Sequence, residues 1–449
     1  MDQIKYNFRF LILASFATAM GGLLFGYDIS VISGTIPFIT EYFVLNEFTK
    51  GFVVSSLYIG CTIGVLLAGR FSDRYGRRKI LMLSALLLMA SSIASAIANN
   101  LGAFFVYRII GGLGVGMASI LSPMYIAEIA PERYRGAFVT INQLTIVIGM
   151  LMAYVVNYLL LSVGADCWRY MLGVMSIPSA CFLLGMFFVP ESPRWLIQNG
   201  HQAKAEAIFQ QIGGEAFAQQ MRSAFQRTIV TTPAKQNAWS AISKIKRVVI
   251  IGSILCFLQQ WSGINTIFFY APDIFAVTGV GIDSQLGQSV FLGIINVAFT
   301  LVAMRLTDRL GRKPLLIIST VGMGVIYLCL GALFYFNQLA GIGVLVLCML
   351  AVALYAIGLA PLMWVVVSEI FPNAIRGVAM SIASSVLWIS CYLLTLTFPM
   401  FMEWLGGEGT FWLYAMICCS GAFFIFKYIP ETKGKTLEEI EQLVTKKHV

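Results

Sequence analysis

Charged residues are scarce in this sequence. Asp, Glu, Lys and Arg make up 11% of its 449 residues, whereas 59% of the residues are hydrophobic, and the mean hydropathy is +0.83. Soluble domains carry about a quarter charged residues, so this scarcity argues against a water-soluble globule, a disordered chain and a nucleic-acid-binding domain. The net charge of +9 would on its own suggest nucleic acid, but the distribution of the charges points to a membrane.

Histidine is nearly absent, and the cysteines form no motif. The two histidines, His201 and His448, both lie in polar stretches, which leaves little basis for histidine catalysis or metal ligation. The nine cysteines are scattered, mostly within apolar runs, and show no CxxC spacing. We therefore expect neither a disulfide framework nor a zinc site.

Catalytic motifs are missing as well. The sequence contains no nucleophile–base set, metal cluster or phosphate-binding loop. The segment GGLGVG (111–116) resembles a dinucleotide fingerprint, but it lies inside an apolar run and follows no strand, so it indicates close helix packing. We expect no enzymatic activity, no cofactor and no bound metal.

Long apolar runs dominate the chain instead. Because about 20 apolar residues cross a bilayer as a helix, they predict an all-α membrane protein with twelve transmembrane helices. The predicted spans lie near residues 10–36, 52–69, 80–99, 101–127, 137–161, 169–189, 248–271, 286–304, 315–335, 340–367, 377–400 and 410–429.

A polar stretch divides these spans into two sets of six. Residues 190–247 show the pattern of short amphipathic helices, for example over 202–212. The expected organisation is therefore an N-terminal six-helix half (1–189), a cytoplasmic helical linker domain (190–247), a C-terminal six-helix half (248–429) and a cytoplasmic tail (430–449).

The basic residues predict the orientation. With both termini inside, 27 of the 30 Lys and Arg residues fall in cytoplasmic segments, and only Lys50 and Arg169 fall outside. The remaining one, Arg108, lies within a span. Cytoplasmic loops of membrane proteins carry an excess of Lys and Arg, so this asymmetry favours cytoplasmic termini.

Three local patterns occur twice, at a common offset of about 240 residues, and every copy sits at a predicted inner helix end. The pairs are GRFSDRYGRR (69–78) with MRLTDRLGRK (304–313), EIAPERYRG (128–136) with EIFPNAIRG (369–377), and PESPR (190–194) with PETKG (430–434). A duplicated six-helix unit explains the matched acidic residues better than a general likeness of basic loops. Parallel repeats of this kind place a substrate path between the halves.

The repeated acidic and basic residues suggest ion pairs at the inner helix ends. Such pairs could clamp the helices in one state and release them in another, and they contribute most where they are partly desolvated. The alternative is simple positive-inside anchoring, and both can hold. The candidate gating residues are Asp73, Arg74, Glu128, Arg135, Asp308, Arg309, Glu369 and Arg376.

Asp28 and Arg108 are the two ionisable residues well inside predicted spans. Asp28 lies nine residues before Pro37, where we expect its span to end, and Arg108 lies eight residues after Asn100. At 1.5 Å per residue both are roughly 12–13 Å from the outer surface, so they could pair. A carboxylate whose pairing changes with conformation could carry a proton. A permanent structural ion pair is the alternative.

Several amides and tryptophans interrupt the apolar spans. Amides donate and accept hydrogen bonds, as a polyhydroxylated ligand requires, and flat rings offer apolar faces to a sugar. Helix spacing alone does not place Gln260 and Asn265 on one face, but Gly263 between them permits a local break. The alternative is that these amides link helices. The residues are Gln143, Gln259, Gln260, Asn265, Asn296, Trp364 and Trp388.

Nine segments spread along essentially the whole chain stand out: GGLLFGYD (21–28), GRFSDRYGRR (69–78), YRIIGGLGVG (107–116), PMYIAEIAPERYRG (123–136), PESPRW (190–195), QQWSGIN (259–265), DRLGRKP (308–314), SEIFPNAIRG (368–377) and PETKGKTLEE (430–439). Together and in this order they resemble the sugar porter family of the major facilitator superfamily. The likeness is closest to bacterial proton-coupled sugar symporters of the D-xylose and galactose type.

The resemblance implies roles for individual residues. Asp28 matches the proton-coupling aspartate, and Arg108 matches its arginine partner. Facilitative relatives carry an uncharged residue at the Asp28 position, so the chain looks like a symporter. Residues 190–247 match the intracellular helical domain that latches the halves. The positions matching the sugar site are Gln143, Gln259, Gln260, Asn265, Asn296 and Trp364, with Phe25 and Trp388 at nearby aromatic positions.

The departures from the family pattern concern specificity. They make the site less polar than usual, and a pocket without a hydroxyl partner can discriminate strongly between polyols. The substrate expectation therefore stops at a pentose, a hexose or a related polyol. The departing residues are Met150, Phe269, Ala360, Leu387 and Cys391.

We expect proton-coupled sugar uptake by alternating access in the cell membrane of a bacterium. The partners would be the sugar, the proton and the lipid bilayer, with no nucleic acid, and the chain would act as a monomer. A facilitative uniporter is the nearest alternative, although Asp28 argues against it. A non-transporting sugar sensor is a further alternative, but only about 20 residues follow the last predicted span.

Overall fold

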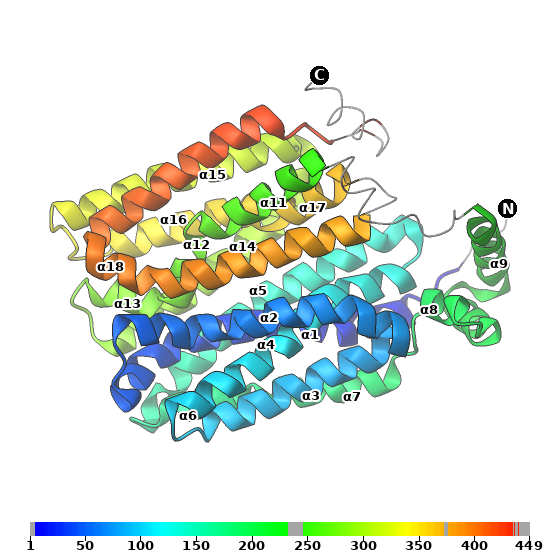
Figure 1. Cartoon of the computed structure of the whole chain (residues 1–449), viewed down its shortest axis with the longest axis horizontal. Helices are drawn as coiled ribbons and strands as arrows, with labels where there is room; N and C mark the ends of the chain where they lie inside the picture. The colour runs from blue at the N-terminus through cyan, green and yellow to red at the C-terminus, as the bar shows by residue number, and fades with distance from the viewer. Residues whose placement is uncertain (1–4, 232–245, 372–375, 434, 436–438, 440–449) are drawn as a thin grey trace.

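In the computed structural model the chain is a bundle of long helices (Figure 1). The structure describes residues 5–231, 246–371, 376–433, 435 and 439, and of residues 133, 224–231, 308, 376 and 377 it describes only the backbone. The helices are α1 (Phe8–Phe43), α2 (Glu47–Tyr75), α3 (Arg77–Ala96), α4 (Leu101–Ile129), η1 (Glu132–Tyr134), α5 (Arg135–Leu160), η2 (Leu161–Val163), α6 (Cys167–Val174), α7 (Ser176–Phe188), α8 (Pro193–Gln198), α9 (Gln202–Thr231), α11 (Lys246–Trp261), α12 (Ile264–Phe269), α13 (Ala271–Ala276), α14 (Ile282–Leu310), α15 (Arg312–Tyr335), α16 (Gly343–Ile357), α17 (Leu359–Ile370) and α18 (Arg376–Tyr428).

These helices confirm the predicted all-α fold with twelve spans. Within the described residues, 11 helices are long and apolar enough to cross a membrane. The last of them, Val378–Tyr428, bends back at Gly406, which has a φ of 68°. It therefore supplies two spans. Spans six, seven and ten are each made of two consecutive helices: α6 with α7, α11 with α12, and α16 with α17.

The first span is longer than expected. The sequence analysis ends it at Pro37, but α1 continues through this proline to Phe43. Proline removes one backbone hydrogen bond, and transmembrane helices tolerate this because neighbouring helices and side chains satisfy the freed groups. Asp28 therefore lies farther from the end of its helix than the sequence suggested.

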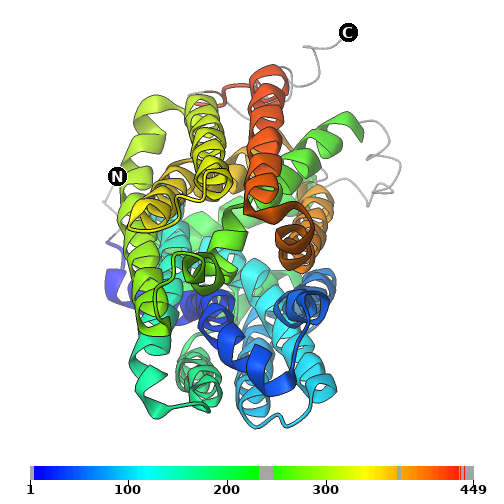
Figure 2. The same ribbon diagram turned by 90° about the vertical axis from the view of Figure 1, so that its left-hand side faces the viewer.

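The spans form two bundles of six that lie side by side. Seen end-on, the first six spans occupy the lower part of the molecule and the second six the upper part (Figure 2). Two helix pairs make the main contacts between the bundles, α2 with α18 and α5 with α14. The short helix α8 and the kinked helix α9 lie at one end of the bundle, which we call the linker end (Figure 1). The α1–α2 turn and α13 lie at the opposite end.

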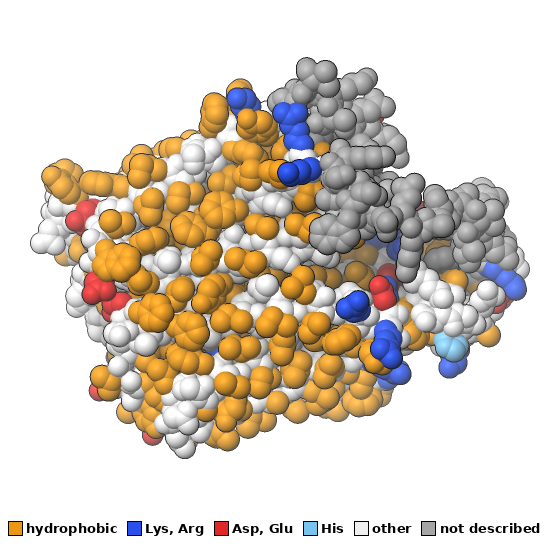
Figure 3. Space-filling view, viewed as in Figure 1, with side chains coloured by type: hydrophobic (Ala, Val, Ile, Leu, Met, Phe, Trp, Pro, Cys, Tyr) orange, Lys and Arg blue, Asp and Glu red, His pale blue; other side chains and the backbone are white. Residues whose placement is uncertain are grey.

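The flanks of the bundle are apolar. Side chains such as Phe188, 87% exposed, and Leu13, 69% exposed, point away from the core. Figure 3 shows hydrophobic side chains spread along the flank, with Lys and Arg gathered toward the linker end. Exposed apolar surface of this extent suits contact with lipid, and the chain is a multi-pass membrane protein.

Glycines allow α2 and α4 to pack with their backbones in contact. A Cβ atom on Gly60 would lie 2.0 Å from the Ile109 carbonyl oxygen, and one on Gly112 would lie 1.9 Å from the Leu57 carbonyl oxygen. Inside a membrane the hydrophobic effect does not drive helices together. Small residues at such crossings stabilise the helix pair through close van der Waals contact instead. The GGLGVG segment, which contains Gly112, therefore serves helix packing, as predicted.

We expect Gly60→Ala to destabilise the protein by about 1–3 kcal/mol, because the added methyl group forces α2 and α4 apart. Thermal unfolding in detergent would measure this as a lower midpoint. Gly69→Ala is a matched control on the same helix, because nothing lies within 4 Å of its Cβ position. Equal midpoints for the two variants would contradict the close crossing.

Candidate functional site

Asp28 of α1 and Arg108 of α4 form an ion pair in the middle of the first bundle. The Arg108 Nη1 donates to the Asp28 carboxylate, and the two residues are 2% and 3% exposed. The structure thus brings together the two residues that the sequence placed at a similar depth. Within the described part of the chain, Arg108 Nε and Nη2 have no hydrogen-bond partner. The Arg108 charge therefore depends on Asp28 for its compensation.

Three amides form a hydrogen-bonded chain in the second bundle. Gln259 Nε2 donates to the Tyr355 hydroxyl at 2.7 Å, Gln260 Nε2 donates to Gln259 Oε1 at 2.7 Å, and Asn265 Nδ2 donates to Gln260 Oε1. Gly263 makes this possible, because its φ of 84° ends α11 and begins α12. The break that the sequence permitted is present, and it places Gln260 and Asn265 together.

Aromatic rings from both bundles meet at the border between the bundles. Phe25 of α1 lies 5.4 Å from Trp388 of α18 in an edge-on arrangement. Tyr58 of α2 stacks on the same Trp388 and also contacts Phe269. A sugar needs apolar faces of this kind for its C–H surface. Tyr58 and Tyr355 were not among the expected residues, because a tyrosine in an apolar span does not by itself indicate a binding site.

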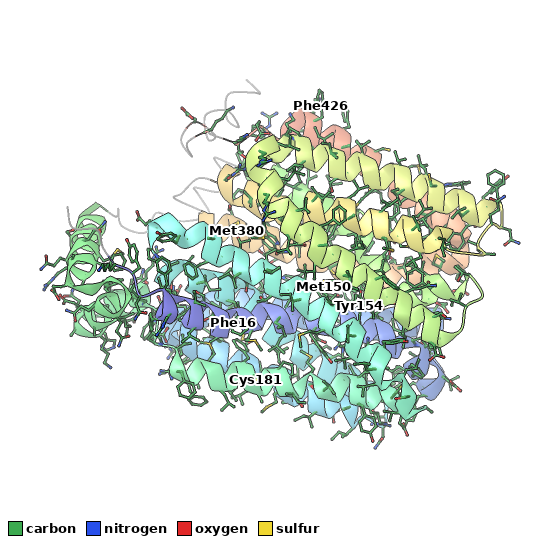
Figure 4. The ribbon with its side chains drawn as sticks, turned by 180° about the vertical axis from the view of Figure 1, so that it is seen from behind. Phe16, Met150, Tyr154, Cys181, Met380 and Phe426 are labelled. Carbon is green, nitrogen blue, oxygen red and sulfur yellow. The ribbon has the colours of Figure 1, made fainter. Side chains whose placement is uncertain are left out.

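The remaining expected residues are less closely connected. Asn296 Nδ2 lies 3.5 Å from the Met150 sulfur across the two bundles, and Figure 4 shows Met150 and Tyr154 on α5 where it borders α14. Sulfur is a weak acceptor, so the Asn296 amide keeps capacity for another partner. Gln143 and Trp364 are half-buried, and neither joins the amide chain among the described residues.

At the linker end of the first bundle, one buried arginine binds both expected acidic residues. Arg77, 5% exposed, lies 3.0 Å from the Asp73 carboxylate and 3.3 Å from Glu128. The expected partners were Arg74 and Arg135, and neither is the cation here. Arg74 lies over the Tyr75 ring, and Arg135 Nε donates to the Ala127 carbonyl.

The geometry of the turn explains this correction. Side chains of neighbouring helix residues point about 100° apart, so Arg74 does not face the side of α2 on which Asp73 lies. Arg77 follows the turn at Gly76, which has a φ of 98°, and its side chain reaches back between α2 and α4. The repeated Gly-Arg pair at Gly76-Arg77 and Gly311-Arg312, 235 residues apart, was the signal that the sequence analysis left unused.

The second bundle repeats this arrangement. Arg312 lies 3.6 Å from the Glu369 carboxylate, so it takes the place that Arg77 has in the first bundle. Arg309 contributes its carbonyl, which accepts a hydrogen bond from Lys433 Nζ at 2.7 Å. The side chains of Asp308 and Arg376, the other two expected gating residues, lie outside the described part of the structure.

Two further glutamates cap helices at the linker end. The Glu191 carboxylate accepts hydrogen bonds from the backbone N–H groups of Arg77 at 2.8 Å and Arg78 at 3.1 Å. The Glu431 carboxylate accepts from Arg312 and Lys313, both at 3.0 Å. A carboxylate at a helix N-terminus satisfies free donors and favours the helix dipole. Both glutamates belong to the repeated Pro-Glu segments, although the sequence analysis assigned them no role.

The two caps differ in their protonation behaviour. Burial raises the pKa of the Glu191 carboxyl above its ordinary value, although the N–H groups of Ser192, Arg78 and Arg77 act in the opposite direction. Burial also raises the pKa of Glu431, but here the N–H donors of Lys433, Arg312 and Lys313 outweigh it and lower the pKa. The Glu431 carboxylate therefore stays ionised to a lower pH than the Glu191 carboxylate.

At the opposite end an ion pair joins the two bundles. Lys50 Nζ, at the start of α2, lies 2.5 Å from the Asp273 carboxylate of α13. A cavity of about 430 Å³ lies beside this pair, and its lining includes Glu47, Tyr270 and Glu403. By contrast, each described ion pair at the linker end stays within one bundle or within α9. Among the described residues, the ion pair that crosses between the bundles is thus at the opposite end.

The second bundle offers polar and apolar groups to an uncharged polar molecule, and the first bundle holds a buried carboxylate. The amide chain supplies donors and acceptors, the rings supply apolar faces, and Asp28 supplies the carboxylate. Among the described residues no group of three or more His, Cys, Asp or Glu side chains could hold a metal ion.

The chain matches the family model for sugar (and other) transporters over residues 14–444. It is 39% identical to the D-xylose-proton symporter of Escherichia coli over 98% of this chain and 96% of that protein. It is 37% identical to the arabinose-proton symporter of Bacillus subtilis, again over 98% and 96%. The solved xylose transporter of E. coli in a partially occluded inward open conformation has a TM-score of 0.85 and 38% identity, covering 95% of this chain and 100% of that one.

The Glu431 cap predicts a pH-dependent stability. Because its pKa is lower in the folded protein than the ordinary value of 4.5, the cap stabilises the fold above that value. This contribution disappears as the pH falls through the lowered pKa. Glu431→Gln should therefore lower the unfolding midpoint at pH 7, and the difference from wild type should vanish in acid. Thermal unfolding in detergent from pH 7 downward checks this, with the exposed Glu41→Gln as the control; a difference independent of pH would contradict the cap.

Proposed function

This chain belongs to the family of sugar and other transporters, and we propose that it takes up a monosaccharide or a related polyol together with a proton. The members of this family are transporters, not enzymes. The relatives named above are proton symporters for two pentoses, D-xylose and arabinose. Identity below 40% does not name the sugar, so the proposal extends to pentoses and hexoses.

The buried Asp28–Arg108 pair carries the proposal for proton coupling. An isolated charge in a membrane interior is costly, so Asp28 is stable as an anion only while Arg108 compensates it. A conformational change that weakens the pair favours the protonated carboxyl. Asp28 therefore takes up a proton in one conformation and loses it in another. A uniporter would need no ionisable group here, which argues against that alternative.

The amide chain and the aromatic rings are the proposed sugar site. Gln259, Gln260 and Asn265 bond to one another, and a sugar hydroxyl that replaces one of these bonds must restore the lost partner. Phe25 and Trp388 close the site from the two halves. In this proposal Gln143, Asn296 and Trp364 join the site when sugar is present.

Alternating access follows from the ion pairs at the two ends. We propose that the linker end faces the cytoplasm and the opposite end faces outward, in the cell membrane of a bacterium. The Lys50–Asp273 pair then closes the outer side, and the Arg77 and Arg312 clusters rearrange as the inner side opens and closes. In this scheme residues 1–189 and 248–429 move as the two halves, residues 190–247 latch them, and residues 430–449 form the tail.

Uptake into proteoliposomes tests the proposal. We expect one of xylose, glucose, galactose, arabinose or myo-inositol to accumulate above equilibrium only when a proton gradient is imposed. Asp28→Asn should lose accumulation while it retains sugar exchange, because the amide cannot release a proton. The exposed Asp166→Asn is a matched control and should accumulate sugar normally.

Two outcomes would contradict this proposal. Equilibration of the sugar without any effect of the gradient would identify a uniporter. Full accumulation by Asp28→Asn would assign the proton to another group.

The Lys50–Asp273 pair predicts a shift of conformation. Lys50→Gln should open the outer side more often, by about fivefold for a pair worth roughly 1 kcal/mol. The alkylation rate of Met402→Cys, in the wall of the outer cavity, by a membrane-impermeant maleimide measures this opening. The charge swap of Lys50→Glu with Asp273→Lys should restore the slow rate. Unchanged labelling in Lys50→Gln would rule out the pair as an outer closure.

A further inference from the structure

Tyr154 of α5 makes a hydrogen bond that crosses from the first bundle to the second. Its hydroxyl donates to the Phe268 carbonyl of α12 at 2.8 Å, and the two residues are 1% and 2% exposed. Figure 4 shows Tyr154 on the part of α5 that borders the second bundle. It lies six residues before the end of α5 at Leu160, which is about 9 Å along the helix. The bond therefore lies in the half of the molecule that is farther from the linker end.

Pro272 explains why the Phe268 carbonyl is free to accept this bond. In a continuous helix the carbonyl of residue 268 would accept from the backbone N–H of residue 272. Residue 272 is the proline near the start of α13 (Ala271–Ala276), and proline has no N–H. A buried carbonyl without a partner costs free energy. The Tyr154 hydroxyl therefore supplies the partner that Pro272 removes.

The same combination occurs inside the second bundle, at Pro399 of α18. This proline removes the helical donor for the Thr395 carbonyl, four residues earlier, and the Tyr270 hydroxyl donates to that carbonyl at 2.8 Å. Tyr270 and Thr395 both belong to the second bundle, so their bond stabilises that bundle alone. The bond of Tyr154 differs, because it must break whenever α5 and α12 separate.

The segment that Tyr154 holds also carries part of the proposed sugar site. α12 (Ile264–Phe269) is short and begins after Gly263, whose φ of 84° interrupts the span. Asn265, which ends the amide chain, lies three residues before Phe268 on α12. The Tyr154–Phe268 bond thus fixes α12 against the first bundle on the side of the amide chain that faces away from the linker end.

We propose that Tyr154 is a positioning residue that holds α12 against the first bundle and so closes the outer side of the sugar site, an inference that rests on the proposed function. In the closed arrangement the hydroxyl and the carbonyl satisfy each other. When the bundles separate at the outer side, water satisfies both groups, so the bond favours closure without making it permanent. Sugar from outside reaches the amide chain only after the bond breaks.

Alkylation of Met402→Cys by the membrane-impermeant maleimide tests this role in proteoliposomes, without sugar or a proton gradient. Tyr154→Phe keeps the ring but leaves the Phe268 carbonyl unpaired, and it does so in the closed arrangement only. It should therefore raise the alkylation rate by about tenfold. Tyr125→Phe is the matched control and should leave the rate unchanged, because the buried Tyr125 hydroxyl donates to the Pro190 carbonyl at 2.7 Å without crossing between the bundles.

Pro272→Ala shows whether the carbonyl that proline leaves free gives the bond its strength. Alanine restores a backbone donor, so the carbonyl keeps a partner when the hydroxyl is lost. Adding Tyr154→Phe to Pro272→Ala should then raise the alkylation rate by only about threefold, the effect of the lost bond alone. If Tyr154→Phe by itself does not fold, the comparison of Pro272→Ala with the double variant decides the question.

Transport kinetics distinguish this role from a general loss of structure. When the outer side opens more often, the apparent affinity for external sugar rises. The KM for exchange of the accumulated sugar should therefore fall in Tyr154→Phe by about the same factor as the alkylation rate rises, while slower closure lowers kcat. Partial misfolding would lower the maximal rate and leave the KM unchanged, and that result would contradict the proposal.

The outcomes separate this inference from the proposed function. An unchanged alkylation rate in Tyr154→Phe, an equal rise in Tyr125→Phe, or equal rates in Pro272→Ala and the double variant would overturn the role of Tyr154 and leave symport intact. Faster alkylation in Tyr154→Phe but not in Tyr125→Phe supports this role even if the wild type accumulates no sugar, a result that would overturn symport.

Discussion

The ion pair between Asp28 and Arg108 is the constraint around which the first bundle is organised. Two charges buried to this degree require each other, because neither has water to stabilise it. The pair holds α1 against α4, and the glycines of α2 and α4 bring those two helices into backbone contact beside it. Close packing thus keeps water away from the Asp28 carboxylate. The same isolation makes the carboxylate sensitive to any movement of Arg108.

The proposed sugar site depends on a different feature, a break in a helix. Gly263 interrupts the seventh span, so amides five residues apart in sequence meet in space. In this state the amides satisfy one another and Tyr355, and the rings of Phe25, Tyr58 and Trp388 cover one another. A ligand must replace these contacts rather than fill a vacant space. Selectivity then comes from how well its hydroxyls restore the bonds it displaces.

Duplication gives the two bundles matching contacts at the linker end. Each bundle carries an arginine after a left-handed glycine, Arg77 or Arg312, and a glutamate cap from the following segment, Glu191 or Glu431. These contacts stiffen the linker end of each bundle without tying the bundles together. The described ion pair between the bundles lies elsewhere, at Lys50 and Asp273. The proposed rocking motion requires two stiff bundles that are joined at only one end in each conformation.

The sequence alone determined the number of spans and the duplication, because these depend on local hydropathy and on motifs that recur at one offset. It also pointed to the pairing of Asp28 with Arg108, but it misjudged the depth of Asp28, because α1 continues to Phe43. It also indicated the break at Gly263, because glycine permits that conformation. Tertiary structure decided which groups are partners. Only the fold could show that Arg77, and not Arg74, binds Asp73 and Glu128, that α1 passes through Pro37, and that Tyr58 stacks on Trp388. Such pairings depend on side-chain direction across helices that are distant in the chain, and no local pattern in the sequence records that direction.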